Sequence, residues 1–243
     1  GLFEKFPVDC VFGMHNMPGT PEGKFRMRVG PIMASGELVT IKITGRGGHA
    51  ARPKQAIDPV VVAGHVITAL QTVVSRNTDP LEHVVVSITR MNAGSAFNII
   101  PETAELAGTL RTFDMGVQEQ TRDAVRRIVE GVAAALGASA EVDFRLVYPP
   151  TVNWPDEVGI AAGAAARVVG AENVDADCDP MMGAEDFAFM LAEKPGCYVL
   201  IGNGEDETDG RSLHSPHYDF NDDILAIGAS YWVELVHTVL GES

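Results

Sequence analysis

Six segments between residues 37 and 147 alternate between strand-like and helix-like patterns, in an order that few folds accommodate. Strand segments show apolar side chains at every second position, whereas helix segments repeat them every three or four positions. The segments are, in order, residues 38–44, 58–75, 84–91, 104–112, 117–136 and 140–147. Strand, helix, strand, strand, helix, strand is the order of a split βαβ unit. We therefore expect a ferredoxin-like unit in this part of the chain.

The sequence on either side of this unit has the pattern of a second, α/β domain. The expected elements are a strand at 8–13, a helix at 157–169, a strand at 197–202 and a helix at 224–240. His15 would lie just beyond the end of the first strand, where α/β proteins hold their ligands. We therefore expect an α/β fold in which residues 34–150 form a domain inserted between residues 1–33 and 151–243.

Charge and cysteine content limit the kinds of partner. The chain has 33 acidic and 18 basic residues, a net charge of −15, so we expect no nucleic-acid and no anionic-membrane partner, because both require a basic surface. Cys10, Cys178 and Cys197 are widely spaced, which fits neither a disulfide framework nor a zinc knuckle. The apolar stretches are too short to span a bilayer. These features favour a cytoplasmic protein that acts on a small molecule or a peptide.

Two histidines, His15 and His214, are candidate metal ligands. Each lies beside a proline, in Gly13–Pro18 and in Leu213–His217, and rigid loops can hold imidazoles at metal distance. Taken alone, a histidine at a strand end can equally be a hydrogen-bonded structural residue. His217 is a weaker candidate, because Pro216 separates it from His214 in an irregular turn.

Three acidic residues after His214 have two interpretations. Asp219, Asp222 and Asp223 are near enough in sequence to orient an imidazole by hydrogen bonding. They also precede the helix expected at 224–240, where an Asp side chain often caps the first turn. For Asp222 and Asp223 we favour the capping interpretation.

His49 follows three glycines, Gly45, Gly47 and Gly48, which let the backbone turn sharply. An exposed histidine on such a loop could donate a hydrogen bond to a developing oxyanion, as a catalytic residue does. The alternative is a surface histidine on a hairpin-like loop. Asn98 lies in a similar connection between strands.

Arg111, Glu185 and Asp186 are candidate substrate-binding residues. The forked guanidinium of Arg111 suits a carboxylate, although a surface cation near the next helix is the alternative. Glu185 and Asp186 form a pair of acids in a turn after Gly183. Adjacent carboxylates at the start of a helix can also serve as caps.

Seven motifs carry a resemblance to one family along essentially the whole chain. They are Gly13–Gly19, Gly45–Pro53, Ala56–Pro59, Asn98–Glu102, Gly108–Phe113, Gly183–Phe187 and Leu213–Phe220. In this order they resemble the two-metal amidohydrolases and carboxypeptidases, which include hippurate hydrolase and the indoleacetyl-amino-acid amide hydrolases. The resemblance implies a zinc-peptidase-like α/β catalytic domain with an inserted lid and dimerisation domain at 34–150.

The resemblance also implies a role for each candidate residue. His15 and His214 match metal ligands for two divalent ions, which could be zinc, manganese, cobalt or nickel. His49 matches a lid histidine that reaches the substrate of the partner subunit in a homodimer. Asn98 and Arg111 match substrate-binding positions of the lid, and Glu185 and Asp186 match a turn near the metals. The implied substrate is an N-acyl amino acid, hippurate-like, or a small peptide.

The family's remaining ligands do not occur in this sequence. Such enzymes carry a Cys and a His in an Asp-Gly-Cys-x-His segment, and a Glu-Glu pair that supplies a ligand and the general base; residues 1–243 contain neither. We therefore expect the C-terminal portion of an amidohydrolase, beginning inside a helix and inactive alone. The alternatives are a non-catalytic dimerisation or interaction module derived from such an enzyme, and a two-histidine metal carrier.

Overall fold

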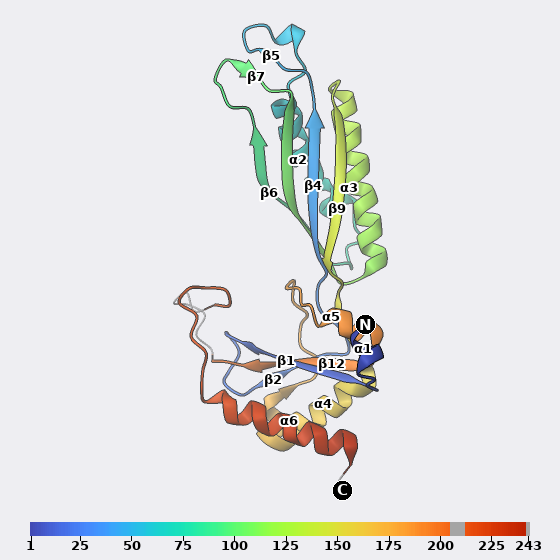
Figure 1. The fold of residues 1–243 in the computed structure, drawn as a ribbon, viewed down its shortest axis with the longest axis vertical. Helices are drawn as coiled ribbons and strands as arrows, with labels where there is room; N and C mark the ends of the chain where they lie inside the picture. The colour runs from blue at the N-terminus through green and yellow to red at the C-terminus, as the bar shows by residue number, and fades with distance from the viewer. Residues whose placement is uncertain (205–211, 242–243) are drawn as a thin grey trace. The chain divides into compact units, whose positions relative to one another are not determined.

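The computed structural model describes residues 1–204 and 212–241 and has a mixed α/β fold (Figure 1). The chain divides into two compact units. Unit 1 comprises residues 1–33, 151–181 and 185–243, and unit 2 comprises residues 34–150 and 182–184. Each unit has its own sheet, helices and hydrophobic core.

Unit 2 contains a four-stranded antiparallel sheet in the order β6-β8-β4-β9. The strands are β4 (Gly36–Thr44), β6 (Val84–Ala93), β8 (Thr103–Thr112) and β9 (Ser139–Tyr148). Along β4, Val39, Ile41 and Ile43 are buried, while the side chains between them are exposed. This period of two is the pattern from which β4 was predicted. All four strands expected from the sequence are confirmed, with ends that differ by one or two residues.

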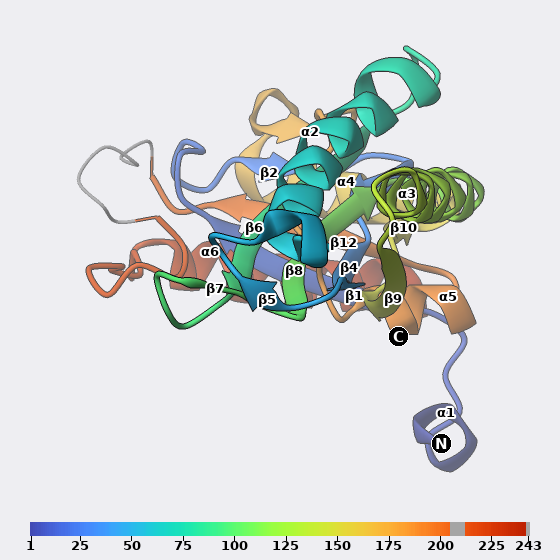
Figure 2. The ribbon, with the colours of Figure 1, turned by 90° about the horizontal axis from the view of Figure 1, so that it is seen from above.

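Two helices cover one face of this sheet: α2 (Pro59–Asn77) and α3 (Met115–Ala135). Figure 2 shows both on the same side of the strands. Asp58 and Asp114 cap them, accepting hydrogen bonds from the backbone N–H groups of Val60 and Val117 at 2.9 Å. Both predicted helices are confirmed. By length and composition α2 could cross a membrane, but its buried stripe packs against this sheet.

A buried ion pair fixes α3 to the start of β4. The carboxylate of Glu37, which is 1% exposed, accepts hydrogen bonds from Arg122 Nε and from Gln118 Nε2, each at 2.9 Å. The hydrogen bond to Glu37 raises the pKa of Arg122 above its ordinary value. Unit 2 thus encloses one fully paired charge at the end where β4 begins.

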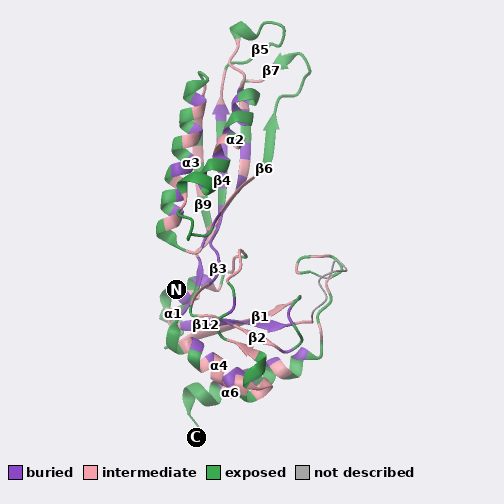
Figure 3. Ribbon diagram, turned by 180° about the vertical axis from the view of Figure 1, so that it is seen from behind, coloured by how far each residue is buried: buried purple, intermediate pink, exposed green. Residues whose placement is uncertain are grey.

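Unit 1 contains a four-stranded sheet in the order β1-β12-β2-β11. The strands are β1 (Val11–Met17), β2 (Phe25–Arg26), β11 (Val174–Asp175) and β12 (Gly196–Gly202). β1 runs parallel to β12 over all seven residues, and β12 is buried throughout, as Figure 3 shows. The strand expected at 8–13 was wrong in its bounds: β1 starts at Val11 and includes His15, because pairing with β12, rather than the local apolar run, sets its length.

Helices cover one face of the β1–β12 pair. They are α4 (Pro155–Val169) and α6 (Ile224–Leu240), and they pack on Phe12, Met14 and Val199. Both helices were predicted from the sequence. The cap expected before α6 was wrong: the Asp223 side chain makes no cap hydrogen bond, and its backbone N–H donates instead to the side chain of Asn221 at 3.0 Å.

The opposite face of the pair packs on a second apolar cluster. This cluster contains Ile32, Cys178, Tyr198 and Leu200. The shorter elements of the chain are α1 (Leu2–Lys5), β3 (Gly30–Met33), β5 (Gly48–His49), η1 (Pro53–Gln55), β7 (Ile99–Ile100), β10 (Thr151–Asn153), η2 (Ala171–Asn173) and α5 (Ala188–Glu193). Most of these elements were not predicted, because two to six residues are too few to show a helical or strand-like spacing of apolar side chains.

Candidate active site

His15 lies near the carboxyl end of β1. Its side chain is on the same face of the β1–β12 pair as those of Tyr198 and Leu200 of β12. Its Nδ1 is 2.6 Å from the backbone carbonyl oxygen of Asn16. A carbonyl oxygen can only accept, so Nδ1 carries a proton, and in the neutral tautomer Nε2 then keeps its lone pair. A backbone bond of this kind fixes the tautomer of metal-binding histidines.

His214 has an unusual backbone conformation. Its φ of 66° makes it the one non-glycine residue with positive φ in the part of the chain that the structure describes. Such a conformation costs roughly 1–3 kcal/mol and is concentrated at functional sites. A turn follows it, in which Ser215 Oγ accepts from the backbone N–H of His217 at 3.1 Å and the Ser215 carbonyl accepts from Tyr218 at 3.1 Å.

Hydrogen bonds join the loop that carries His214 to the ends of β1 and β12. The side-chain amide of Asn16 donates to the hydroxyl group of Tyr218. Asn203, directly after β12, accepts from the backbone N–H of Asn221 at 3.0 Å and donates to the carbonyl of Asp219 at 3.3 Å. The two histidine-bearing segments, distant in sequence, therefore meet at the carboxyl ends of two parallel strands.

Sequence reasoning did not single out the three residues that make this junction. Asn16 and Tyr218 lie inside the motifs of His15 and His214, and this proximity was the available signal. Asn203 lies outside every motif and carried no signal.

The histidines of unit 1 fit part of a divalent-metal site. Imidazole nitrogens bind zinc, nickel, copper and iron, and His15 presents a free Nε2. Among the described residues, however, no group of three His, Cys, Asp or Glu side chains is arranged to hold a metal ion. The two imidazoles can therefore supply two ligands, and a site with two metals requires carboxylates in addition.

Glu185 is held by three donors near the face of the sheet that carries His15. Its Oε2 accepts from the hydroxyl group of Tyr198 at 2.5 Å, and its Oε1 accepts from the backbone N–H groups of Asp186 and Phe187 at 2.9 and 3.4 Å. A Cβ at Gly13 would lie only 2.9 Å from the Tyr198 ring. The absence of a side chain at Gly13 thus makes room for the tyrosine that anchors Glu185.

The two carboxyl groups of this turn differ in acidity. Burial raises the pKa of Glu185, but the hydrogen bonds from Tyr198 and from Asp186 more than offset it, so its pKa lies below the ordinary value. The hydrogen bond to Glu185 raises the pKa of Asp186. Burial, reinforced by Glu185, raises the pKa of Tyr198. Glu185 is therefore an ionised anchor, and the exposed Asp186 is the member of the pair that solvent reaches.

His49 and Asn98 lie side by side in unit 2. β5 pairs with β7, and the backbone N–H of Ala50 donates to the Asn98 carbonyl at 3.0 Å. The exposed His49 ring accepts a hydrogen bond at Nδ1 from the backbone N–H of Ala51 at 3.1 Å. The proton of the neutral ring is then on Nε2, which can donate to a ligand.

Glycines are required in the loop of His49 for steric reasons. A Cβ at Gly45 would lie 2.1 Å from the carbonyl oxygen of Ile57, and one at Gly47 would lie 3.1 Å from that of Ile100. The close backbone approach that the glycine spacing suggested is thus present, made to Ile57 before α2 and to Ile100 of β7, both in the same unit.

Arg111 lies on β8 and is half-buried. Its Nη1 donates a hydrogen bond of 2.8 Å to the backbone carbonyl oxygen of Met182, which also belongs to unit 2. This bond holds one arm of the guanidinium, and the other arm makes no hydrogen bond to a described residue, so its donors remain for a ligand.

Comparison with known proteins gives a consistent result. The model of Peptidase family M20/M25/M40 matches residues 1–238. The chain is 40% identical over 235 residues to hippurate hydrolase of Campylobacter jejuni and 41% identical over 234 residues to N-acetylcysteine deacetylase of Bacillus subtilis. These alignments cover 97% and 96% of this chain and 60% of each relative, so the chain spans about 60% of their length.

A solved structure agrees in fold. The crystal structure of Bacillus subtilis YXEP protein, described as a dinuclear metal binding peptidase from the M20 family, superposes with a TM-score of 0.78 at 33% identity. The superposition covers 97% of this chain and 58% of that one.

Proposed function

The chain belongs to peptidase family M20/M25/M40, and on that premise we propose that it is part of a metal-dependent hydrolase that cleaves the amide bond of N-acyl amino acids. The observation that carries the proposal is the convergence of the His15 and His214 segments at the ends of β1 and β12. The names of two relatives support the substrate class, since hippurate and N-acetylcysteine are both N-acyl amino acids.

In this proposal His15 and His214 each offer an imidazole to a site for two divalent ions, such as zinc, manganese, cobalt or nickel. Bound ions would supply a polarised carbonyl group and an activated water at neutral pH. The hydrogen bond from His15 Nδ1 to Asn16 holds the ring with Nε2 available. The carboxylate ligands and the general base would come from residues outside this chain.

His49 is proposed as the catalytic hydrogen-bond donor. Its Nε2–H would stabilise the negative charge that develops on the oxygen of the scissile carbonyl group, in the active site of a second copy of the chain. Asn98, held beside it, would contact the same substrate. Neither side chain is needed to hold metal in this scheme.

Arg111 is proposed to bind the free carboxylate of the amino-acid moiety. A guanidinium binds a carboxylate through two parallel hydrogen bonds, and the Met182 carbonyl fixes its orientation in advance. For Glu185 and Asp186 the proposal is narrower: Glu185 shapes the turn beneath the site, and Asp186 is the carboxyl group available to substrate.

Unit 2 is proposed as the lid and as the dimerisation domain. Among the described strands β6 pairs only with β8, which leaves a ten-residue edge strand open, and open edges of this length tend to acquire partners. Beside it, α2 exposes the small residues Gly64 and Thr68.

A matched pair of glycines tests the dimer. A Cβ at Gly64 on α2 or at Gly131 on α3 would meet nothing within 4 Å in its own chain. Gly64→Arg should therefore dissociate the dimer, whereas Gly131→Arg should leave it intact, as measured by analytical ultracentrifugation. A dimer that survives the change at Gly64 and not that at Gly131 would place the interface on the other helix.

As a 243-residue chain the protein should have little or no activity, because the described residues hold no third ligand. A longer protein that contains this chain and supplies the remaining ligands should hydrolyse hippurate. It should hydrolyse hippuramide, which lacks the free carboxylate, much more slowly. Rapid hydrolysis of hippurate by the metal-saturated 243-residue chain would refute the proposed division of the site. If the longer protein dimerises but does not hydrolyse hippurate, the alternative of a non-catalytic interaction module is favoured.

A further inference from the structure

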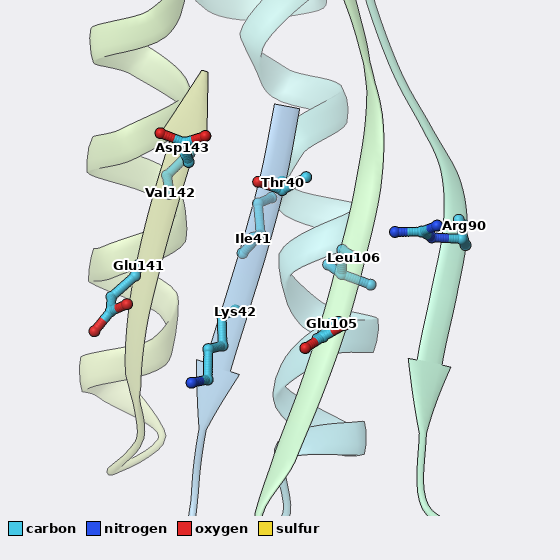
Figure 4. A pocket seen from close by; sticks show the side chains of 9 residues that line it. All are labelled: Thr40, Ile41, Lys42, Arg90, Glu105, Leu106, Glu141, Val142 and Asp143. Atoms are coloured by element: carbon cyan, nitrogen blue, oxygen red, sulfur yellow. The ribbon is translucent and has the colours of Figure 1, made fainter. Parts of the chain in front are cut away.

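One face of the unit 2 sheet carries no helix among the described residues. α2 and α3 pack on the face that carries Val39 and Ile41, and the opposite face carries Thr40 and Lys42. Figure 4 looks onto this bare face, with the helices behind the strands. A hollow of about 460 Å³ lies there, over the middle of the four strands.

Strand register sets the charges on one side of the hollow. Lys42 on β4 pairs in register with Glu141 on β9 and with Glu105 on β8. Neighbouring strands are about 4.8 Å apart, so the three side chains form a row with a cation between two carboxylates.

A second row crosses the hollow with its charges at the two ends. Asp143 on β9 pairs with Thr40, Thr40 pairs with Ala107, and Ala107 pairs with Arg90 on β6. Arg90 and Asp143 are therefore three strand spacings apart, about 14 Å between backbones, and the small side chains between them form the floor. Figure 4 shows the Arg90 side chain reaching from β6 toward β8.

The charges around the hollow differ from those on the helices of the same unit. On α3, Arg122 pairs with Glu119 and Arg126 pairs with Asp123, at 2.8 and 3.3 Å. Within the described part of the chain, none of the five charged residues that line the hollow forms an ion pair. They are Lys42, Arg90, Glu105, Glu141 and Asp143. Opposite charges on opposite rims, with no ion pair between them, suit a ligand that brings one charge of each sign.

We propose that this hollow binds a small zwitterion with one carboxylate and one ammonium group, that is, a free α-amino acid. Arg90 would bind the carboxylate through its guanidinium fork, and Asp143 would accept hydrogen bonds from the ammonium group. An anion alone would meet three carboxylates, and a cation alone would meet Arg90 and Lys42. The reaction proposed above would release a molecule of this class, but binding at the hollow needs neither metal nor hydrolysis.

The test is a titration of the 243-residue chain with glycine, followed by amide NMR in a buffer that contains a metal chelator. The chelator removes any metal bound at His15 and His214, so glycine cannot bind through that metal. The outcome therefore does not depend on the proposed hydrolase function. Glycine should give saturable shifts in β6 and β9, which carry Arg90 and Asp143, and in β4 and β8 between them. N-acetylglycine lacks the ammonium group and glycinamide lacks the carboxylate, so each should bind about tenfold more weakly or worse.

Three surface variants complete the test. Arg90→Ala and Asp143→Asn should each weaken glycine binding about fivefold or more, through the loss of a charge-assisted hydrogen bond. Arg145→Ala is the matched control, because Arg145 is an exposed arginine of β9 that does not line the hollow, and its change should leave the affinity as it was. No saturable shift, equal binding of the two analogues, or unchanged affinity in both Arg90→Ala and Asp143→Asn would overturn the proposal.

Discussion

The two units differ most in charge. Unit 1 contains 21 acidic and 7 basic residues, a net charge of −14, whereas unit 2 contains 12 and 11, a net charge of −1. Nearly all of the negative charge therefore belongs to the unit that holds His15 and His214, where it favours cations. The near-neutral unit carries Arg111 and His49, which suit an anionic substrate. The division matches the proposal, in which the metal ligands lie in unit 1 and the residues that bind the anionic part of the substrate lie in unit 2.

The two cores are also closed to different degrees. In unit 2 both helices and the central strands bury a continuous cluster that includes Val66, Leu106 and Val125. In unit 1, β1 pairs on one side only among the described strands, and α6 exposes Val233 and Val236 by more than half. We therefore expect unit 2 to unfold at a higher denaturant concentration than unit 1.

The largest difference should come from matched ion pairs. Glu37 and Arg122 are paired in the interior of unit 2, whereas Arg167 and Glu234 join α4 to α6 at the surface of unit 1. Arg122→Ala leaves the buried carboxylate of Glu37 without a counter-charge and should lower the free energy of unfolding by about 3–5 kcal/mol. Glu234→Ala should cost about 1 kcal/mol or less. Denaturant unfolding measures both, and equal effects would remove the contrast.

A pair of buried glycines should give the next effect. A Cβ at Gly108 in unit 2 would lie 2.0 Å from the Ser87 carbonyl oxygen, and one at Gly196 in unit 1 would lie 2.1 Å from that of Val11. Alanine at either position should destabilise its own unit by about 1–3 kcal/mol, because strand backbone must move. Calorimetry should show that each change lowers the unfolding transition of one unit only; if both transitions fall together, the units are not independent.

Alkaline pH should act on unit 1 alone. Burial raises the pKa values of Tyr198 and Tyr231, both in unit 1. A group whose pKa is raised by folding contributes stability below its unfolded pKa, near 10 for tyrosine, and loses it as the pH rises further. Each tyrosine should thus remove up to about 1.4 kcal/mol per pH unit above pH 10.

The measurement is denaturant unfolding of unit 1 at two alkaline pH values, with tyrosinate absorbance as the readout of ionisation. Tyr231→Phe is an informative control, because the buried Tyr231 hydroxyl has no hydrogen-bond partner among the described residues. The change should therefore remove its share of the pH dependence at little cost in stability. A unit 2 transition that falls equally would contradict the assignment.

The sequence was most informative where a periodic apolar pattern extends over many residues. The helices α2 and α3 and the strand β4 follow from their apolar spacing, and Asp58 marked the start of α2. It was least informative where structure depends on distant pairing. β1 extends through His15 because β12 lies beside it, and no local pattern in either strand encodes that register.

For the candidate site, the motifs named the side chains but not their hydrogen-bond partners. The Tyr198 hydroxyl that anchors Glu185 lies 13 positions away, and the Asn16–Tyr218 bond spans 202 positions. Only the folded chain brings such partners together. The tautomers of His15 and His49 likewise depend on backbone groups whose positions the sequence does not specify.

We propose that His15 and His214 of unit 1 bind metal and that His49 of unit 2 acts on substrate. Elemental analysis beside turnover, in a longer protein that contains this chain and the remaining ligands, tests it most directly. His214→Ala should lose metal, whereas His49→Ala should keep the full metal content and lose about 10²–10³ in turnover, as expected for one oxyanion donor. A His49→Ala protein that has lost its metal, or a His214→Ala protein that has kept it, would contradict the account.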